Sequence, residues 1–509
     1  MSGIKKLAGQ TLWYGGSSIF GRFLNYLLNP LLAQLFASEK FGIISNLFAI
    51  AAFLNIIFTY GLETSYFRFN NLHPEKKVYN TTFFSLLTST LLLGIILFAS
   101  HQYIATNLLE LPNHPEYVLW VILIVMFDAL SVLPLAKLRY EGRPIKFAAV
   151  RILTILLNIA LILFFLVYCD NLYKKGEDSF WLNFYNPKIG LGYVIIANVI
   201  ASGVGLLLLT RELFQFSFQF DKDLWKKIMT YTWPLVIVGF GGMINEMIDR
   251  FMILHRYPGT TTEAYSQVGI YSANYKLAVL IVLFIQAFRM GAEPFFFKTS
   301  AEQNAPRTYA RVMKFFVITC CLCFLGVVLF LDIWKYFMGT RYPEYYTGLK
   351  IVPVIMLAKI FLGIYYNLSV WYKLTNRNLT GAYITLAGAG ITIAFNYFFI
   401  PLWGYTACAI ATVLCYSFMM IVSYRLGQQH FPVPYAWKKL AAYIVICIMI
   451  FGLHQLVRYF SPTVLLTHIA GIVLLSGFVL FILKIEKKEF QKLPYISKYL
   501  YKSPKTAID

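Results

Sequence analysis

The chain is poor in charged residues, and acidic residues are the scarcer kind. Only 13% of its 509 residues are Asp, Glu, Lys or Arg, whereas a soluble domain has roughly 25%. Hydrophobic residues make up 59% of the chain, and the mean hydropathy is +0.64. Together these values exclude a soluble globular protein and indicate an integral membrane protein.

Signatures of catalysis and of metal binding are also missing. The 7 histidines are scattered, and no His-Glu-x-x-His or Gly-x-Ser-x-Gly pattern occurs. Cys320, Cys321 and Cys323 lie close together in one apolar run, where a helix would splay their thiols and no histidine is near. This arrangement favours packing over zinc binding. We therefore expect neither an enzyme nor a metal site.

Long apolar runs recur from one end of the chain to the other. Each has roughly 20 residues, which is enough for a helix to cross the ~30 Å hydrocarbon layer of a membrane. The longest connection on the predicted outer side, residues 169–188, is too short for a soluble domain. We therefore predict an all-α polytopic membrane protein with about fourteen transmembrane helices. The predicted spans are residues 11–36, 41–67, 78–100, 117–136, 146–168, 189–210, 230–254, 268–297, 311–333, 347–370, 380–400, 403–424, 438–458 and 463–484.

Basic residues explain the orientation of these spans. The 44 basic residues outnumber the 23 acidic ones, and most of them lie in alternate loops, such as those that contain Lys76 and Lys77 or Arg139 and Arg143. Positively charged loops stay in the cytoplasm, so we expect a protein of the cytoplasmic membrane with both termini inside. No nucleic-acid-binding module occurs, which leaves topology and contact with anionic lipid as the reasons for the excess charge.

An internal repeat relates spans that are six apart. The second span begins Phe-Gly-Ile-Ile-Ser at residues 41–45, and the eighth begins Val-Gly-Ile-Tyr-Ser at residues 268–272. The first and seventh spans share polar residues at the same spacing, and these are Asn25 with Asn29 and Asn245 with Asp249. An even spacing gives both copies the same orientation in the membrane.

The repeat predicts two parallel six-helix bundles related by a pseudo-two-fold axis along the membrane normal. The first bundle occupies residues 1–215 and the second residues 216–430. Two additional helices, thirteen and fourteen, follow in residues 431–485, and a basic cytoplasmic tail occupies residues 486–509. Transporters built from such halves usually bind their substrate at the interface between them.

Polar and charged residues inside the spans predict a central cavity. A charge at the bilayer centre costs at least ~2.5–3.5 kcal/mol, so it needs a polar cavity or a partner. Alternatives remain for several residues: a helix-locking ion pair for Arg22, snorkelling for Arg250, and anchoring at the two interfaces for Lys276 and Arg289. The predicted substrate-binding residues are Arg22, Asn25, Asn29, Arg250, Lys276, Arg289 and Lys359.

Acidic residues in the spans are candidates for ion coupling. A buried carboxylate that lacks a partner can bind a proton or a sodium ion, and the sequence does not choose between the two. Glu246 with Arg250 and Arg289 with Glu293 form i, i+4 pairs that can neutralise themselves. The candidate ion-coupling residues are Glu63, Asp128, Asp249 and Glu293.

Partners can be predicted for some of these charges. We expect Asp249 to face the first span near Arg22 or Asn29. Glu63 has the nearby Arg68 as an alternative partner. Lys359 and Asp128 have no local partner, so we expect them to pair across helices or to line the cavity.

Several motifs resemble one membrane protein family. Residues 396–407 read Asn-Tyr-Phe-Phe-Ile-Pro-Leu-Trp-Gly-Tyr-Thr-Ala, which is similar to the Asn…Ile-Pro-x-x-Gly-x-x-Gly-Ala signature of polysaccharide-export flippases. Tyr405 and Thr406 depart from the small-residue part of that signature. Residues 233–250, from Trp-Pro-Leu to Asp-Arg, and the start of the eighth span resemble corresponding segments of the same family. The chain is thus identified as resembling the Wzx-type branch of the MATE-like MOP superfamily.

This resemblance implies transport without covalent chemistry and without a cofactor other than a coupling H⁺ or Na⁺. The implied activity is flipping of a polyprenyl-pyrophosphate-linked oligosaccharide, an O-antigen or exopolysaccharide repeat unit, by alternating access. The alternatives are a lipid II flippase and a MATE-like cation-coupled multidrug antiporter. The excess of deep basic residues favours an anionic substrate, because arginine binds phosphate through paired hydrogen bonds. The expected partners are the lipid bilayer and a polysaccharide polymerase, and a monomer is expected.

Overall fold

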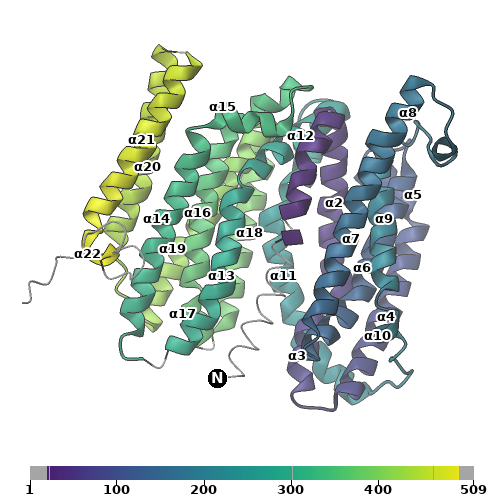
Figure 1. The fold of residues 1–509 in the computed structure, drawn as a ribbon. Helices are drawn as coiled ribbons and strands as arrows, with labels where there is room; N and C mark the ends of the chain where they lie inside the picture. Colours follow the sequence, from purple (N-terminus) through teal and green to yellow (C-terminus); the bar gives the residue numbers. More distant parts are fainter. Residues whose placement is uncertain (1–19, 22, 301, 376, 462, 492–509) are drawn as a thin grey trace, which may run out of the picture.

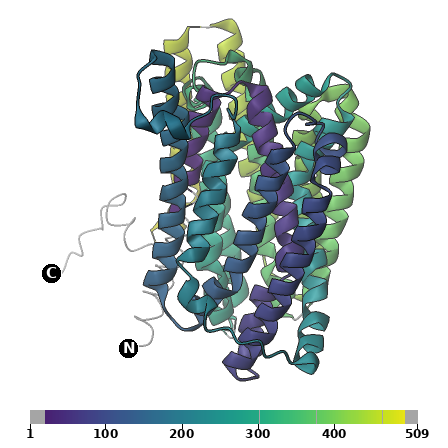
Figure 2. The same ribbon diagram turned by 90° about the vertical axis from the view of Figure 1, so that its right-hand side faces the viewer.

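Helices make up nearly all of the computed structural model, which describes residues 20–491 except 22, 301, 376 and 462 (Figure 1). Twelve helices in this part of the chain are long and apolar enough to cross a membrane. They run alongside one another, and the view turned by 90° confirms this arrangement (Figure 2). The predicted class, an all-helical multi-pass membrane protein, is therefore confirmed.

The long helices follow the predicted spans to within a few residues at most ends. Their bounds are α2 (Ser38–Thr59), α3 (Leu62–Asn70), α4 (Glu75–Ala99), α6 (Pro115–Tyr140), α7 (Pro144–Leu163), α9 (Gly192–Leu207), α11 (Lys222–Arg256), α12 (Thr261–Leu277), α13 (Val279–Thr299), α14 (Ala305–Val328), α16 (Val352–Leu368), α18 (Asn378–Trp403), α19 (Tyr405–His430), α20 (Trp437–Phe460) and α21 (Val464–Ile485).

Short helices lie at the ends of the long ones. They are α5 (His101–Tyr103), η1 (Ile104–Leu108), η2 (Phe164–Cys169), α8 (Asp170–Lys175), η3 (Phe180–Phe184), α10 (Thr210–Leu213), α15 (Leu331–Trp334), η4 (Lys335–Met338), η5 (Pro343–Ile351), α17 (Val370–Leu374) and α22 (Lys487–Phe490). In Figure 1, α8, α15 and the start of α12 lie at one end of the molecule, and α3, α10 and α17 lie at the other. We call these the α8 end and the α3 end.

Three predicted spans differ from the structure in an informative way. The span at residues 189–210 is a shorter helix, α9, of 16 residues. The span at residues 268–297 begins earlier, at Thr261, because a capping box of Thr260 and Glu263 starts α12 before the apolar sequence does. The first span begins outside the described residues, and residues 23–35 of it are helical.

Helices α2 and α12 pack backbone to backbone at the α8 end. A Cβ atom on Gly42 would lie 1.9 Å from the carbonyl oxygen of Tyr265, and one on Gly269 would lie 1.8 Å from that of Ser38. The hydroxyls of Ser38 and Ser266 are 2.7 Å apart. Only glycine allows such an approach, which is a common way for helices to associate in membranes. The two glycines occupy equivalent positions of the sequence repeat.

Further hydrogen bonds close the α8 end around this crossing. The backbone N–H of Ser38 donates to Glu344 Oε1 at 3.0 Å, and the Tyr345 hydroxyl donates to the Phe36 carbonyl at 2.8 Å. The Tyr265 hydroxyl donates to the carbonyl of Leu109. We call α2, α12 and these contacts the α2–α12 seam.

Helices α20 and α21 stand at one edge of the molecule, where they pack on α14 (Figure 1). Glu486, which follows α21 and is 2% exposed, accepts bonds from three side chains. Lys314 Nζ lies 2.7 Å from Oε2, while Lys439 Nζ and the Tyr443 hydroxyl lie 2.6 and 2.5 Å from Oε1. This carboxylate therefore joins the edge helices to α14.

Candidate binding site

Glu246 of α11 is the centre of a buried polar network. Lys359 Nζ of α16 lies 2.8 and 2.9 Å from its two carboxylate oxygens. The hydroxyl of Tyr416, on α19, donates to Oε1 and that of Tyr275, on α12, donates to Oε2, both at 2.7 Å. Four helices thus converge on one carboxylate.

Helical spacing explains why these side chains meet. Residues 245, 246, 249 and 250 recur at i, i+4 on α11 and therefore share a face, as do residues 271 and 275 on α12. Where these faces oppose one another, the tyrosine hydroxyls of α12 reach the carboxylates of α11. Burying these groups is tolerable because each carboxylate receives hydrogen bonds.

Asp249 forms a second part of the network, one turn further along α11. The Tyr271 hydroxyl donates to its Oδ2 at 2.5 Å, and Asn396 Nδ2 donates to its Oδ1 at 2.7 Å. Asp249 is 1% exposed and Asn396 is fully buried. The Oδ1 atom of Asn396 has no hydrogen-bond partner in the part of the chain that the structure describes.

The hydrogen bonds of Asp249 test one of the two neighbours predicted for it in the first span, Asn29, and that pairing is wrong. Its bonds go to α12 and α18, not to Asn29. Asn29 instead donates to the carbonyls of Asn25 and Tyr26 within its own helix, at 3.1 and 3.0 Å, and Asn25 is exposed. Arg22, the other predicted neighbour, lies outside the described residues.

Arg250 is buried, with 5% exposure, so it does not snorkel to the membrane surface. Its guanidinium lies 4.8 Å from the ring centre of Tyr275 and 5.2 Å from that of Tyr271. It donates to the backbone carbonyl of Glu246 at 2.5 Å. The predicted pair between the two side chains is therefore wrong, because the Glu246 carboxylate binds Lys359 instead.

A cavity of about 250 Å³ adjoins the network. Its wall contains the carboxylate of Glu246 together with the cationic residues Arg289 and Lys373. The other lining residues are Val238, Gly242, Asn245, Leu362, Tyr365, Tyr366, Ser369, Tyr372, Thr385, Tyr416 and Met419. The ionisable side chains on this wall comprise more basic than acidic groups, tyrosines aside.

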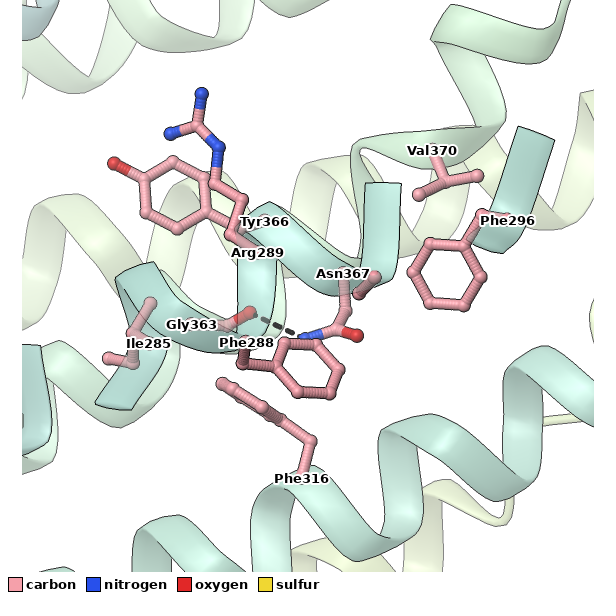
Figure 3. Close-up of a pocket in the computed structure, with 10 residues that line it drawn as sticks. Ile285, Phe288, Arg289, Phe296, Phe316, Gly363, Tyr366, Asn367 and Val370 are labelled. Carbon is pink, nitrogen blue, oxygen red and sulfur yellow. Dashed lines mark hydrogen bonds between the residues drawn. The ribbon is translucent and has the colours of Figure 1, made fainter. Parts of the chain in front are cut away.

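Arg289 separates this cavity from a smaller apolar one. The small cavity has a volume of about 10 Å³ and is lined by Phe288, Phe296 and Phe316 among others. Figure 3 shows that the Arg289 guanidinium points away from the phenylalanine rings and lies beside Tyr366. The distance from its central carbon to the Tyr366 ring centre is 4.8 Å. The guanidinium of Arg289 therefore lies on the side of the larger, polar cavity.

The remaining candidates lie elsewhere or are neutralised. Asp128 of α6 is next to Ser202 and Arg151. Glu63 pairs with Arg139 rather than with Arg68, which stacks on the Tyr231 ring at 4.1 Å. Lys276 is half-buried on α12, and the Glu293 side chain lies outside the described residues.

The structure therefore unites three predicted residues, Asp249, Arg250 and Lys359, in one network and places Arg289 at the adjoining cavity. It makes Glu246, which the sequence indicated only as a partner of Arg250, the central acceptor, and it adds Tyr271, Tyr275 and Tyr416 as donors that the sequence did not single out. The i, i+4 spacing of the two α12 tyrosines is the signal that could have identified them.

Comparisons with known proteins agree with this architecture. Residues 7–300 match the model of a family described as "Polysaccharide biosynthesis protein". No curated protein matches the chain. Among solved structures, the inward closed conformation of the lipid II flippase MurJ is similar with a TM-score of 0.72 and 13% identity, over 92% of this chain and 98% of that one.

A multidrug resistance MATE family transporter of the MOP superfamily, in its inward-facing conformation, is similar with a TM-score of 0.62 and 14% identity. The match covers 83% of this chain and 95% of that one. The VcmN MATE transporter of Vibrio cholerae gives a TM-score of 0.53 and 15% identity, over 84% of this chain and 98% of that one. At these identities the likeness concerns the fold.

Proposed function

Because the chain belongs to the polysaccharide biosynthesis protein family and has the MOP fold, we propose that it flips a polyprenyl-pyrophosphate-linked oligosaccharide across the cytoplasmic membrane. The substrate is an O-antigen or exopolysaccharide repeat unit whose lipid tail stays in the bilayer. The observation that carries the proposal is the cavity beside α11, which Arg289 and Lys373 line together with Glu246, the partner of Lys359. Cations in a membrane interior suit a diphosphate.

The charge of this cavity also argues against the multidrug antiporter. A cavity for cationic drugs should be dominated by carboxylates and aromatic faces. Here Lys359 neutralises the Glu246 carboxylate. Two of the tyrosine rings that line the cavity already lie against the protein's own cations, Tyr366 against Arg289 and Tyr416 against Lys359.

The proposal includes a topology. The twelve long apolar helices, α9 and the first span make fourteen transmembrane helices, in two bundles of residues 1–215 and 216–430 with two more helices in residues 431–485. The α3 end, where Lys76, Lys77 and Arg139 gather, faces the cytoplasm, as do both termini and the basic tail of residues 486–509. The protein acts as a monomer and hands its product to a polysaccharide polymerase.

We propose Asp249 as the ion-coupling carboxylate. The unpaired oxygen of Asn396, next to Asp249, offers a second buried acceptor for a sodium ion or for a proton on the carboxyl. Asp128 and Glu63 have arginine neighbours and are weaker candidates, and Glu293 stays a prediction.

Export of a surface polysaccharide tests the transport function. We expect Arg22→Ala, Arg289→Ala and Lys359→Ala each to abolish export in cells that depend on this chain, while the variants still insert in the membrane. A matched control is Lys335→Ala, because Lys335 lies at the α8 end and pairs only loosely with Asp332, at 3.9 Å. Normal export by all three variants would refute the cavity assignment.

The same cells distinguish the alternatives. If the chain rescues a strain that lacks its lipid II flippase and has no effect on polysaccharide export, the protein is a lipid II flippase. Increased drug resistance without either effect would support the antiporter.

A further inference from the structure

We propose that Glu246 occupies a latent anion-binding site, and that a diphosphate takes its place there during transport. The inference rests on the proposed function and deepens it, since it identifies where the charged head group of the substrate binds. Glu246 is then an internal counter-ion of Lys359 that the ligand displaces, and not only one half of a structural ion pair between α11 and α16.

The positions of the two charges support exchange. The Lys359 side chain is 1% exposed, whereas the Glu246 side chain retains 34% exposure, and Glu246 lines the polar cavity. The carboxylate therefore stands between the ammonium group and the cavity. An anion that enters the cavity can reach Lys359 only where Glu246 now lies.

The donors around Glu246 form a set that fits a phosphate. Lys359 Nζ and the hydroxyls of Tyr275 and Tyr416 converge on its two oxygens at distances of 2.7–2.9 Å. A phosphate group presents oxygens of the same kind, and charge-assisted bonds of this length are the strong ones. If Glu246 turns away, these three donors are left ready for another oxyanion.

The aromatic rings keep Lys359 in place when its partner changes. Its Nζ lies 4.9 Å from the ring centre of Tyr275 and 5.2 Å from that of Tyr416. Cation–π contacts of this kind hold an ammonium group without neutralising its charge. Arg289, on the wall of the same cavity, supplies a cation for the second phosphate of a diphosphate.

A purely structural pair would behave differently from an occupied anion site. Removing one partner of a buried ion pair leaves an uncompensated charge, and an anion from solution can compensate it only if the site is open to the cavity. The variant Glu246→Gln tests this difference, because glutamine keeps the size of glutamate and removes its charge.

The experiment measures binding of inorganic pyrophosphate to the purified full-length protein in lipid nanodiscs, by calorimetry and by the shift in thermal unfolding. We expect Glu246→Gln to bind pyrophosphate about tenfold or more tightly than the unchanged protein, which corresponds to one charge-assisted hydrogen bond. The double variant Glu246→Gln with Lys359→Met should lose this gain. The control Glu344→Gln removes a carboxylate in the α2–α12 seam, away from the cavity, and should leave pyrophosphate binding unchanged.

A second variant covers the case in which Glu246→Gln does not fold. Tyr275→Phe combined with Tyr416→Phe keeps both charges but removes two of the donors that hold Glu246. A phosphate in this site would lose the same two donors, so we expect pyrophosphate to displace the carboxylate only weakly and to give a small shift in thermal unfolding. Adding Lys359→Met to this variant should abolish that shift.

The inference is wrong if Glu246→Gln binds pyrophosphate no better than the unchanged protein, or if the gain persists after Lys359→Met. If only the variant with Tyr275→Phe and Tyr416→Phe folds, the inference is also wrong when its pyrophosphate-induced shift in thermal unfolding persists after Lys359→Met is added. Because pyrophosphate binding is measured without transport, it is independent of the export assay. Binding without export would refute the flippase function, and export without binding would refute the site.

Discussion

At the scale of single residues, the two carboxylates of α11 differ in what they bind. Glu246 accepts from an ammonium group and two hydroxyls, so a cation of the protein itself neutralises its charge. Asp249 accepts from a hydroxyl and an amide, which stabilise a charge without cancelling it. Because its partners leave its charge uncancelled, Asp249 is the better of the two carboxylates for reversible binding of a coupling ion.

This difference leads to a prediction for Asp249→Asn. Asparagine still accepts a bond from Tyr271 but carries no charge, so it cannot bind a proton or a sodium ion as a carboxylate does. We expect export to fall about tenfold or more, the effect of losing one charged contact, and to stop responding to proton and sodium gradients. Vesicles with imposed gradients provide the measurement.

The matched control is Asp332→Asn, because Asp332 pairs with Arg458 at 2.9 Å near the α8 end and away from α11. This variant should keep the gradient response. If Asp249→Asn responds to both gradients as the unchanged protein does, Asp249 is not the coupling residue.

The sequence predicts which residues are charged inside the membrane, but not which of them meet. Lys359, Arg250 and Asp249 could be singled out because a charge within an apolar run is costly wherever it lies. The partner of Lys359 depends on how α11 and α16 are rotated toward each other, and residue spacing within one helix carries no information about that rotation. For the same reason the spacing suggested Asn29 as a neighbour of Asp249, whereas its hydrogen bonds go to α12 and α18.

At the scale of helices, the positions of the spans were predictable because membrane thickness fixes the length of an apolar helix. The start of α12 was predicted seven residues too late, at residue 268 and not at Thr261, because hydropathy alone was used. Its first turns, Thr-Thr-Glu-Ala-Tyr-Ser-Gln, are too polar to count as membrane sequence, yet a capping box and the close approach to α2 make them helical. Helix packing therefore decides what hydropathy leaves open.

The attachment of the edge helices to α14 also depends on a single residue, Glu486. Burial raises the pKa of the Glu486 carboxyl, but hydrogen bonds from Lys314, Lys439 and Tyr443 outweigh this effect, so that the pKa lies below its ordinary value. A lowered pKa means that the stabilisation is present above the unfolded-state pKa, about 4.3 for glutamate, and is lost as pH falls through the folded-state value.

We therefore expect Glu486→Gln to lower the free energy of unfolding by about 1–3 kcal/mol at pH 7, since two lysines lose a charged partner. Hydrogen exchange should increase in α20 and α21 more than in α11 or α16, and the unchanged protein should approach this behaviour only in acid. Glu489→Gln is the control, because Glu489 belongs to the same cluster but pairs with the half-exposed Arg311 and lies 3.7 Å from Lys314, farther than Glu486 does. Equal exchange in both variants would show that Glu486 does not hold the edge helices.

At the scale of the whole molecule, the α2–α12 seam holds the α8 end of the structure closed. The seam brings repeat-equivalent segments of the chain into backbone contact and closes the α8 end. The alternating access that we propose requires this end to separate while the other closes. The glycines allow a contact that is close yet free of ionic bonds between α2 and α12, so the seam can open without leaving buried charges unpaired on these helices.

Locking the seam should therefore stop transport. The hydroxyls of Ser38 and Ser266 are 2.7 Å apart, and this separation suits a disulfide of about 2.05 Å between sulfur atoms. We expect the double variant Ser38→Cys with Ser266→Cys to form this bond under oxidising conditions and to lose nearly all export, because the α8 end can no longer open. Reduction should restore export, and each single variant should transport normally under both conditions. If the cross-linked protein exports at the normal rate, the α2–α12 seam does not separate during transport, and the substrate leaves by another route.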